Sequence, residues 1–72
     1  MKVTLATTLG EILQNPKTAA VFEKYKPGAA NNAVFKIGQH LSMEKISTYK
    51  HANISPEAFK ALMAELEALG DV

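Results

Sequence analysis

The sequence predicts an all-α fold, a compact bundle of four to five short helices preceded by a short extended N-terminal lead-in. Helix-capping residues recur before apolar residues that are spaced three and four apart, which is the pattern of amphipathic helices. Proline and glycine residues separate these segments. With only 72 residues, the chain has room for one domain, spanning 1–72.

The first two helices are predicted to follow one another with almost no loop. Thr8 and Glu11 form a capping box, in which each side chain accepts a hydrogen bond from the other residue's backbone, so a helix begins at Leu9. Asn15 ends this helix because a residue before proline avoids helical geometry. Asn15 also caps the second helix, which begins at Pro16.

Five residues indicate how the first part of the chain is arranged. Val3 and Leu5 alternate with polar neighbours, so we expect both side chains on the core. Gly10 lies inside the first helix, where glycine costs about 1 kcal/mol relative to alanine, which indicates that another backbone approaches closely. Pro27-Gly28 ends the second helix.

Three more helices are expected in the second half. Asn31 or Asn32 can cap a short helix over residues 33–37 that stops at Gly38. Ser42 caps a fourth helix that ends near Lys50 or His51.

The last helix, roughly 56–69, has Ser55 as its cap and Pro56 at its first position, and Gly70 ends it. Its expected core face consists of Phe59, Leu62, Met63, Leu66 and Leu69. Its expected solvent face carries Lys60, Glu65 and Glu67.

Composition excludes several classes of function. The chain has no cysteine, which removes disulfides, thiolate metal sites and thiol catalysis. Its eight basic residues are all lysines, and arginine is the residue that binds phosphates and guanine edges best, so we expect no nucleic acid partner. No apolar run reaches the roughly 20 residues of a membrane span, so we expect no membrane partner.

No catalytic constellation is predicted. His40 and His51 lack further ligands in register for a metal site, and Glu65 and Glu67 point to different sides of one helix. We therefore expect no enzyme activity and no catalytic, cofactor-binding or metal-binding residue in this chain.

One group of residues is more aromatic and apolar than its predicted loops and short helices require. Most of its members are expected in the core, and any that are exposed would mark a docking patch for a protein or a neighbouring domain. The candidate residues are Tyr25, Val34, Phe35, Ile37, Met43 and Tyr49.

The order of the sequence signals resembles a known family. The motifs that carry the resemblance are Thr8-Leu9-Gly10-Glu11-Ile12-Leu13, Asn15-Pro16, Ala20-Val21-Phe22-Glu23-Lys24-Tyr25, Pro27-Gly28, Leu41-Ser42-Met43 and Ile54-Ser55-Pro56. They are similar to a small bacterial helical domain of unknown function, related to the amino-terminal domain of iron–sulfur-cluster-repair proteins. Many of those relatives have cysteines where this chain has Lys26-Pro27-Gly28-Ala29-Ala30, so their redox or metal role is not carried over.

The Tyr25-Lys26-Pro27-Gly28 form also resembles helical C-terminal tails of some bacterial hydrolases, in which catalysis belongs to another domain. The leading hypothesis is therefore a non-catalytic helical interaction or accessory module, either free-standing and cytoplasmic or part of a larger protein whose location the domain does not define. A homodimer is one form that such an interaction could take.

Two alternatives remain open at this stage. The first is a small-ligand-binding domain with a pocket between the first two helices and the segment 34–37, to which His40 or Tyr49 would contribute polar groups. The second, ranked lower, is a DNA-binding helix-turn-helix within residues 42–69, whose second helix would present Glu57, Glu65 and Glu67 to phosphates.

Overall fold

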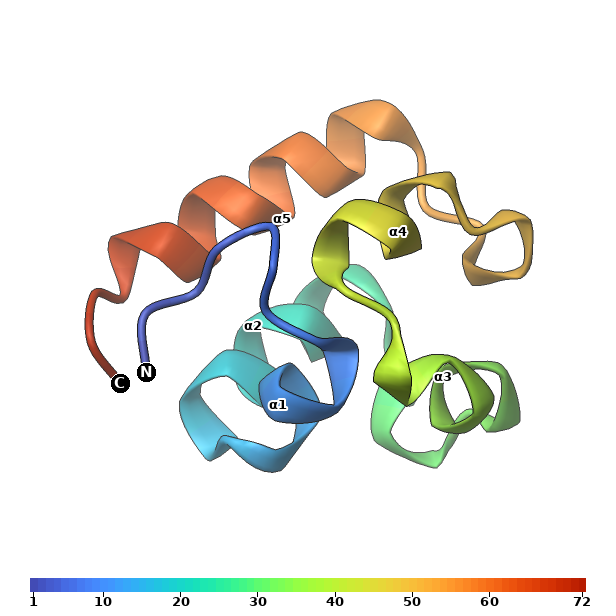
Figure 1. The fold of residues 1–72 in the computed structure, drawn as a ribbon, viewed down its shortest axis with the longest axis horizontal. Coiled ribbons are helices and arrows are strands. Elements are labelled where there is room, and N and C mark those ends of the chain that lie inside the picture. The colour runs from blue at the N-terminus through green and yellow to red at the C-terminus, as the bar shows by residue number, and fades with distance from the viewer.

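The computed structural model describes residues 1–72 and confirms the all-α fold, with five α-helices, three short 3-10 turns and no strand. The helices are α1 (Leu9–Gln14), α2 (Pro16–Tyr25), α3 (Ala33–Ile37), α4 (Met43–Thr48) and α5 (Pro56–Ala68), and the turns are η1 (Ala29–Asn31), η2 (Gly38–His40) and η3 (Lys50–Ala52). Figure 1 shows α5 as the longest helix, lying along one side of the molecule, with the two termini next to each other.

The predicted caps are confirmed and explain where the helices begin. The capping box of Thr8 and Glu11 is complete, and the side-chain oxygen of Asn15 accepts a hydrogen bond from the backbone N–H of Lys17. Asn32, Ser42 and Ser55 cap α3, α4 and α5 in the same way. Each cap satisfies an N–H group that has no partner inside its helix.

The starts of α1 and α4 are also held together by their backbones. The N–H of Leu9 donates to the carbonyl of Leu41 at 2.9 Å, and the N–H of Met43 donates to the carbonyl of Thr7 at 2.8 Å. Both N–H groups lie in the first turn of their helix, where they have no partner inside that helix. Each donates instead to a carbonyl that lies just before the other helix.

The lead-in is not extended throughout, and the expectation that Leu5 lies in the core is wrong. Val3 is buried, but 45% of Leu5 is exposed. A turn causes the difference, because the N–H of Thr7 donates to the carbonyl of Thr4 at 3.1 Å and the N–H of Thr4 donates to the hydroxyl of Thr7 at 2.9 Å. This turn ends the strand-like alternation between Val3 and Leu5.

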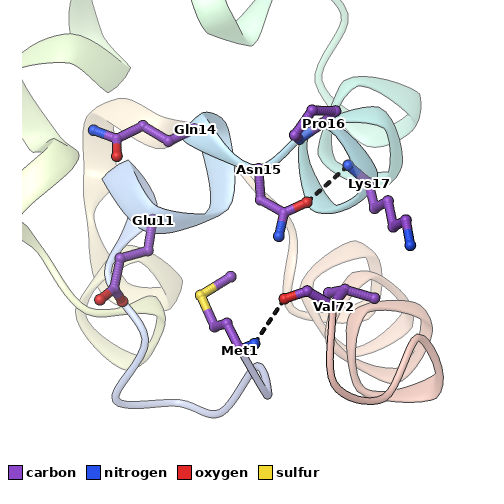
Figure 2. A pocket seen from close by; sticks show the side chains of 7 residues that line it. All are labelled: Met1, Glu11, Gln14, Asn15, Pro16, Lys17 and Val72. Carbon is purple, nitrogen blue, oxygen red and sulfur yellow. Dashed lines mark hydrogen bonds between the residues drawn. The ribbon is translucent and has the colours of Figure 1, made fainter.

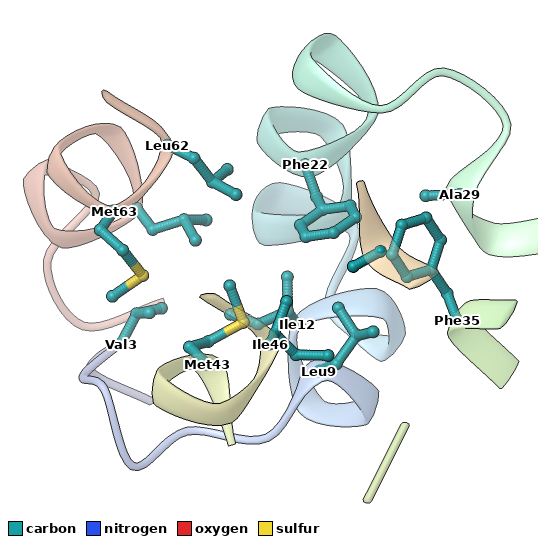
Figure 3. Packing of buried hydrophobic residues seen from close by; sticks show 12 residues of the cluster. Val3, Leu9, Ile12, Phe22, Ala29, Phe35, Met43, Ile46, Leu62 and Met63 are labelled. Atoms are coloured by element: carbon teal, nitrogen blue, oxygen red, sulfur yellow. The ribbon is translucent and has the colours of Figure 1, made fainter. Parts of the chain in front are cut away.

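The core is one cluster of buried apolar side chains drawn from all five α-helices (Figure 3). Its members are Val3, Leu9, Ile12, Phe22, Ala29, Phe35, Met43, Ile46, Ala52, Leu62, Met63 and Leu66. The rings of Phe22 and Phe35 meet edge to face, with centroids 5.4 Å apart. Leu69, expected on the core face, is instead partly exposed because it follows the end of α5, where the chain turns away through Gly70 with φ +72°.

Two further expectations concern helix spacing and length. A methyl group added to Gly10 would lie 3.1 Å from the carbonyl oxygen of Gln39, which confirms the close backbone approach predicted at this glycine. The fourth helix is shorter than expected, because α4 ends at Thr48 and the chain continues as η3.

Glu65, expected to point into solvent, is partly exposed and also binds residues of α2. Its carboxylate accepts hydrogen bonds from the ammonium group of Lys24 and the hydroxyl of Tyr25, both at the end of α2. The bond with Lys24, followed by that with Tyr25, lowers the pKa of the Glu65 carboxyl below its ordinary value. The ionised carboxylate therefore links α5 to α2.

Acid is expected to weaken this link. The pKa of Glu65 is lower in the folded chain than in the unfolded chain. The stabilisation that the Glu65 carboxylate provides is therefore complete above the unfolded-state pKa of a glutamate, and it is lost as the pH falls through the lowered folded-state pKa. Melting temperatures of Glu65→Gln should therefore fall less steeply than those of the wild type between about pH 5 and pH 3. Glu67→Gln, on the same helix, should retain the wild-type slope, and equal slopes in all three proteins would contradict the prediction.

Candidate interaction surface

Two of the six candidate docking residues lie in the core, as expected for most of them, and are therefore not part of a docking patch. Phe35 is 2% exposed and Met43 is fully buried. Phe35 packs against the ring of Phe22. Met43 is the first residue of α4, and its N–H donates to the carbonyl of Thr7 in the lead-in. Neither side chain can touch a partner while the chain is folded.

Tyr25, another candidate docking residue, has a hydrogen-bond partner within the fold. Its side chain is half-buried at the end of α2, and its hydroxyl donates to Glu65 of α5. That hydrogen bond and burial raise the pKa of the Tyr25 hydroxyl, so it stays protonated and remains a donor. The contacts of Tyr25 are thus internal to the fold.

Ile37 is the most exposed large hydrophobic residue, with 76% of its surface accessible to solvent. Val34 precedes it by three residues on the same side of α3 and is half-buried. Tyr49 is also half-buried and adjoins the end of α3, since a methyl group added to Gly38 would lie 3.4 Å from its Cε2 atom. We use the name Ile37 patch for Ile37 together with the two half-buried residues Val34 and Tyr49, of which Tyr49 also packs against the core.

Helical geometry explains why the apolar segment 33–37 cannot be buried completely. Successive residues of a helix are rotated by about 100°, so Ile37 lies roughly 200° from Phe35. Phe35 faces the core, and Ile37 must therefore face solvent. Val34 and Ile37 are only about 60° apart around the helix axis, so both lie on the outer side of α3.

The surroundings of the Ile37 patch are basic. Lys36 and Lys50 are exposed neighbours in sequence of Ile37 and Tyr49, and the imidazole of His51 meets the Tyr49 ring edge to face at 5.5 Å. Between Tyr25 and Glu57 the sequence contains four lysines and a single acid. The region that carries the patch therefore favours an acidic counterpart.

The ligand pocket predicted between the first two helices and the segment 34–37 is absent, because Phe35 fills that space. Two hollows occur elsewhere. The first, about 600 Å³, is lined by Met1, Glu11, Gln14, Asn15, Pro16, Lys17 and Val72 (Figure 2). Two pairs of its lining residues are hydrogen-bonded: the Met1 amino group donates to the Val72 carbonyl at 2.7 Å, and the backbone N–H of Lys17 donates to the side-chain oxygen of Asn15.

The second hollow is a more apolar groove beside α5, about 700 Å³ in volume. Its lining residues are Leu5, Ser47, Pro56, Phe59, Lys60, Met63, Ala64 and Glu67. Neither hollow includes His40 or Tyr49, the polar residues expected in a pocket. The groove was not predicted from the sequence, since its formation depends on the turn that places Leu5 outside the core.

The remaining observations concern chemistry. Thr7 and Thr18 are the only buried polar residues, and both hydroxyls form hydrogen bonds. No three His, Asp or Glu side chains gather where they could hold a metal ion. None of the helices has the length and apolar character that crossing a bilayer requires.

The fold and its surface define a small all-α module with one exposed apolar patch and one apolar groove. No protein-family model, curated protein or solved structure matches this chain. The family resemblance drawn from the sequence motifs thus stays a prediction.

Proposed function

We propose that this chain is a non-catalytic helical interaction module and that the Ile37 patch is its docking surface. The observation that carries the proposal is the exposure of Ile37, the most exposed of the large hydrophobic residues. Its partner would be a protein, separate or part of the same polypeptide, that offers an apolar pocket with acidic residues at its edge.

The physical chemistry of the patch supports docking over a structural role. Burying an isoleucine side chain contributes about 1.5–3 kcal/mol, and most of this remains unrealised at Ile37 in the isolated chain. Tyr49 adds an aromatic surface, a residue type enriched in interfaces. Lys36 and Lys50 at the rim would accelerate association with an acidic surface and select against basic ones.

A site-specific crosslinker tests where a partner binds. We would place a photoreactive benzoylphenylalanine at position 37 in one protein and at Leu69, another exposed apolar position, in a second. After irradiation in cells that express the chain naturally, position 37 should yield one discrete protein adduct that position 69 does not. Equal labelling from both positions, or no adduct from position 37, would argue against the Ile37 patch.

Ile37→Ser should then weaken binding of the identified partner by at least about tenfold, or about 1.4 kcal/mol, when the purified proteins are titrated calorimetrically. Isoleucine and serine have similar helix propensities and the side chain is exposed, so the melting temperature should not change. Leu69→Ser serves as the control and should bind like the wild type. Unchanged affinity of Ile37→Ser would refute the proposed surface.

A further inference from the structure

The turn η3, which follows α4, is fixed to the rest of the fold. Its last residue, Ala52, is 3% exposed and belongs to the core. The N–H of Ala52 donates to the carbonyl of Tyr49 at 3.1 Å. The ammonium group of Lys26 donates to the carbonyl of Asn53, the residue after the turn. These contacts hold the backbone on both sides of His51, so the fold sets where its side chain begins.

The imidazole of His51 lies at the rim of the Ile37 patch. Its ring meets the ring of Tyr49, a member of the patch, edge to face with centroids 5.5 Å apart. The side chain of His51 is exposed and belongs to neither of the two ion pairs in the chain. A charged group on a protein bound at the patch can therefore reach the imidazole directly.

The charged groups around His51 are mainly cations. Lys50 precedes it in η3, and Lys36 lies on α3, which η3 contacts. Lys26 reaches the backbone just after the turn. The nearest acid along the chain is Glu57, in the exposed first turn of α5, and it is not paired with His51. The chain itself thus provides no carboxylate that binds this imidazole.

Histidine is the side chain whose charge changes between about pH 5 and pH 8, whereas lysines stay charged and exposed carboxylates stay ionised over this range. We propose that protonation of His51 regulates the Ile37 patch, so that the patch binds its acidic partner more tightly as the pH falls. This proposal rests on the docking function proposed above for the patch.

The direction of the pH effect follows from the charges that meet in the complex. A carboxylate at the edge of the partner's pocket stabilises the charged imidazole more than the neutral one. Binding therefore takes up a proton, and by linkage a proton strengthens binding to the same extent. The added affinity is complete in mild acid, where His51 is charged before binding, and it is lost as the pH rises and the complex releases this proton.

The size of the effect is set by the position of His51 at the rim, where water still reaches the new ion pair. Exposed ion pairs change an equilibrium constant by between about twofold and about fivefold. The contact with the Tyr49 ring favours the upper part of this range, because the imidazole loses little conformational freedom when a carboxylate binds. The lysines at the same rim add an attraction that does not change over this pH range.

Crosslinking followed by titration provides the test. The chain with benzoylphenylalanine at position 37 is irradiated in a lysate of cells that express it naturally, at about pH 5.5 and about pH 8, and the adduct identifies the partner. In calorimetric titrations, the purified partner should bind the wild-type chain about two to five times more tightly at the lower pH. His51→Gln should remove this ratio.

Lys50→Gln is the matched control, because it removes a neighbouring charge that stays constant over this pH range. It should lower the affinity at both pH values and keep the wild-type ratio. Circular dichroism should show equal helix content in all three proteins at both pH values, since the side chains of Lys50 and His51 are exposed.

The outcomes separate this inference from the docking function. If position 37 yields no adduct at either pH, the docking function fails and the role of His51 fails with it. If the partner binds the wild type equally at both pH values, the patch docks without a contribution from His51, and only this inference is overturned. It is also overturned if His51→Gln keeps the wild-type ratio, because His40 or a group on the partner then supplies the pH dependence.

Discussion

Replacing Phe22 with alanine is expected to reduce the free energy of unfolding by about 3–5 kcal/mol. The Phe22 side chain is fully buried and forms the edge-to-face contact with Phe35, so its removal leaves a cavity at the centre of the core. A chain of this length is expected to have a total stability of about 4–11 kcal/mol. The melting temperature should fall by at least about 12 °C, measured by circular dichroism.

Phe59→Ala is the matched control because it removes the same atoms from a half-buried position at the groove. Its surroundings are already open to water on one side, so its loss should be smaller than that of Phe22→Ala. If the two substitutions destabilised the chain equally, Phe22 would not occupy the centre of the core.

The helix starts could be predicted from the sequence because they depend on local chemistry. Thr8, Asn15, Ser42 and Ser55 each cap a helix through a bond to a residue two or three positions ahead, and this spacing is visible in the sequence. Gly10 allowed one tertiary contact to be predicted, since a glycine inside a helix indicated a close neighbour. The sequence did not indicate that the neighbour was Gln39.

The docking surface could be predicted only in part because exposure depends on tertiary packing. Within the apolar segment 33–37, helical rotation shows that Phe35 and Ile37 face opposite ways but not which of them faces the core. The bonds of Glu65 were missed for the same reason, because its partners Lys24 and Tyr25 are about 40 residues away in the sequence. The α5 groove depended on the outward turn of Leu5.

Thr18 has a structural role that the sequence analysis did not identify. In a continuous helix the carbonyl of Ile12 would accept a hydrogen bond from the N–H of residue 16, but Pro16 has none. The buried hydroxyl of Thr18 donates to this carbonyl at 2.6 Å. The side chain thus replaces the donor that proline removes, and it permits α1 and α2 to join without a loop.

Thr18→Val should therefore lower the free energy of unfolding by about 1–3 kcal/mol, because valine keeps the shape of threonine but leaves the Ile12 carbonyl unpaired. Denaturant unfolding would measure the loss. Thr48→Val is the matched control, since the Thr48 hydroxyl donates to the Lys45 carbonyl on the surface, where water can replace it. That substitution should change stability by less than about 0.5 kcal/mol. A similar effect at both positions would mean that the carbonyl of Ile12 finds another donor and that Thr18 does not hold the junction of α1 and α2.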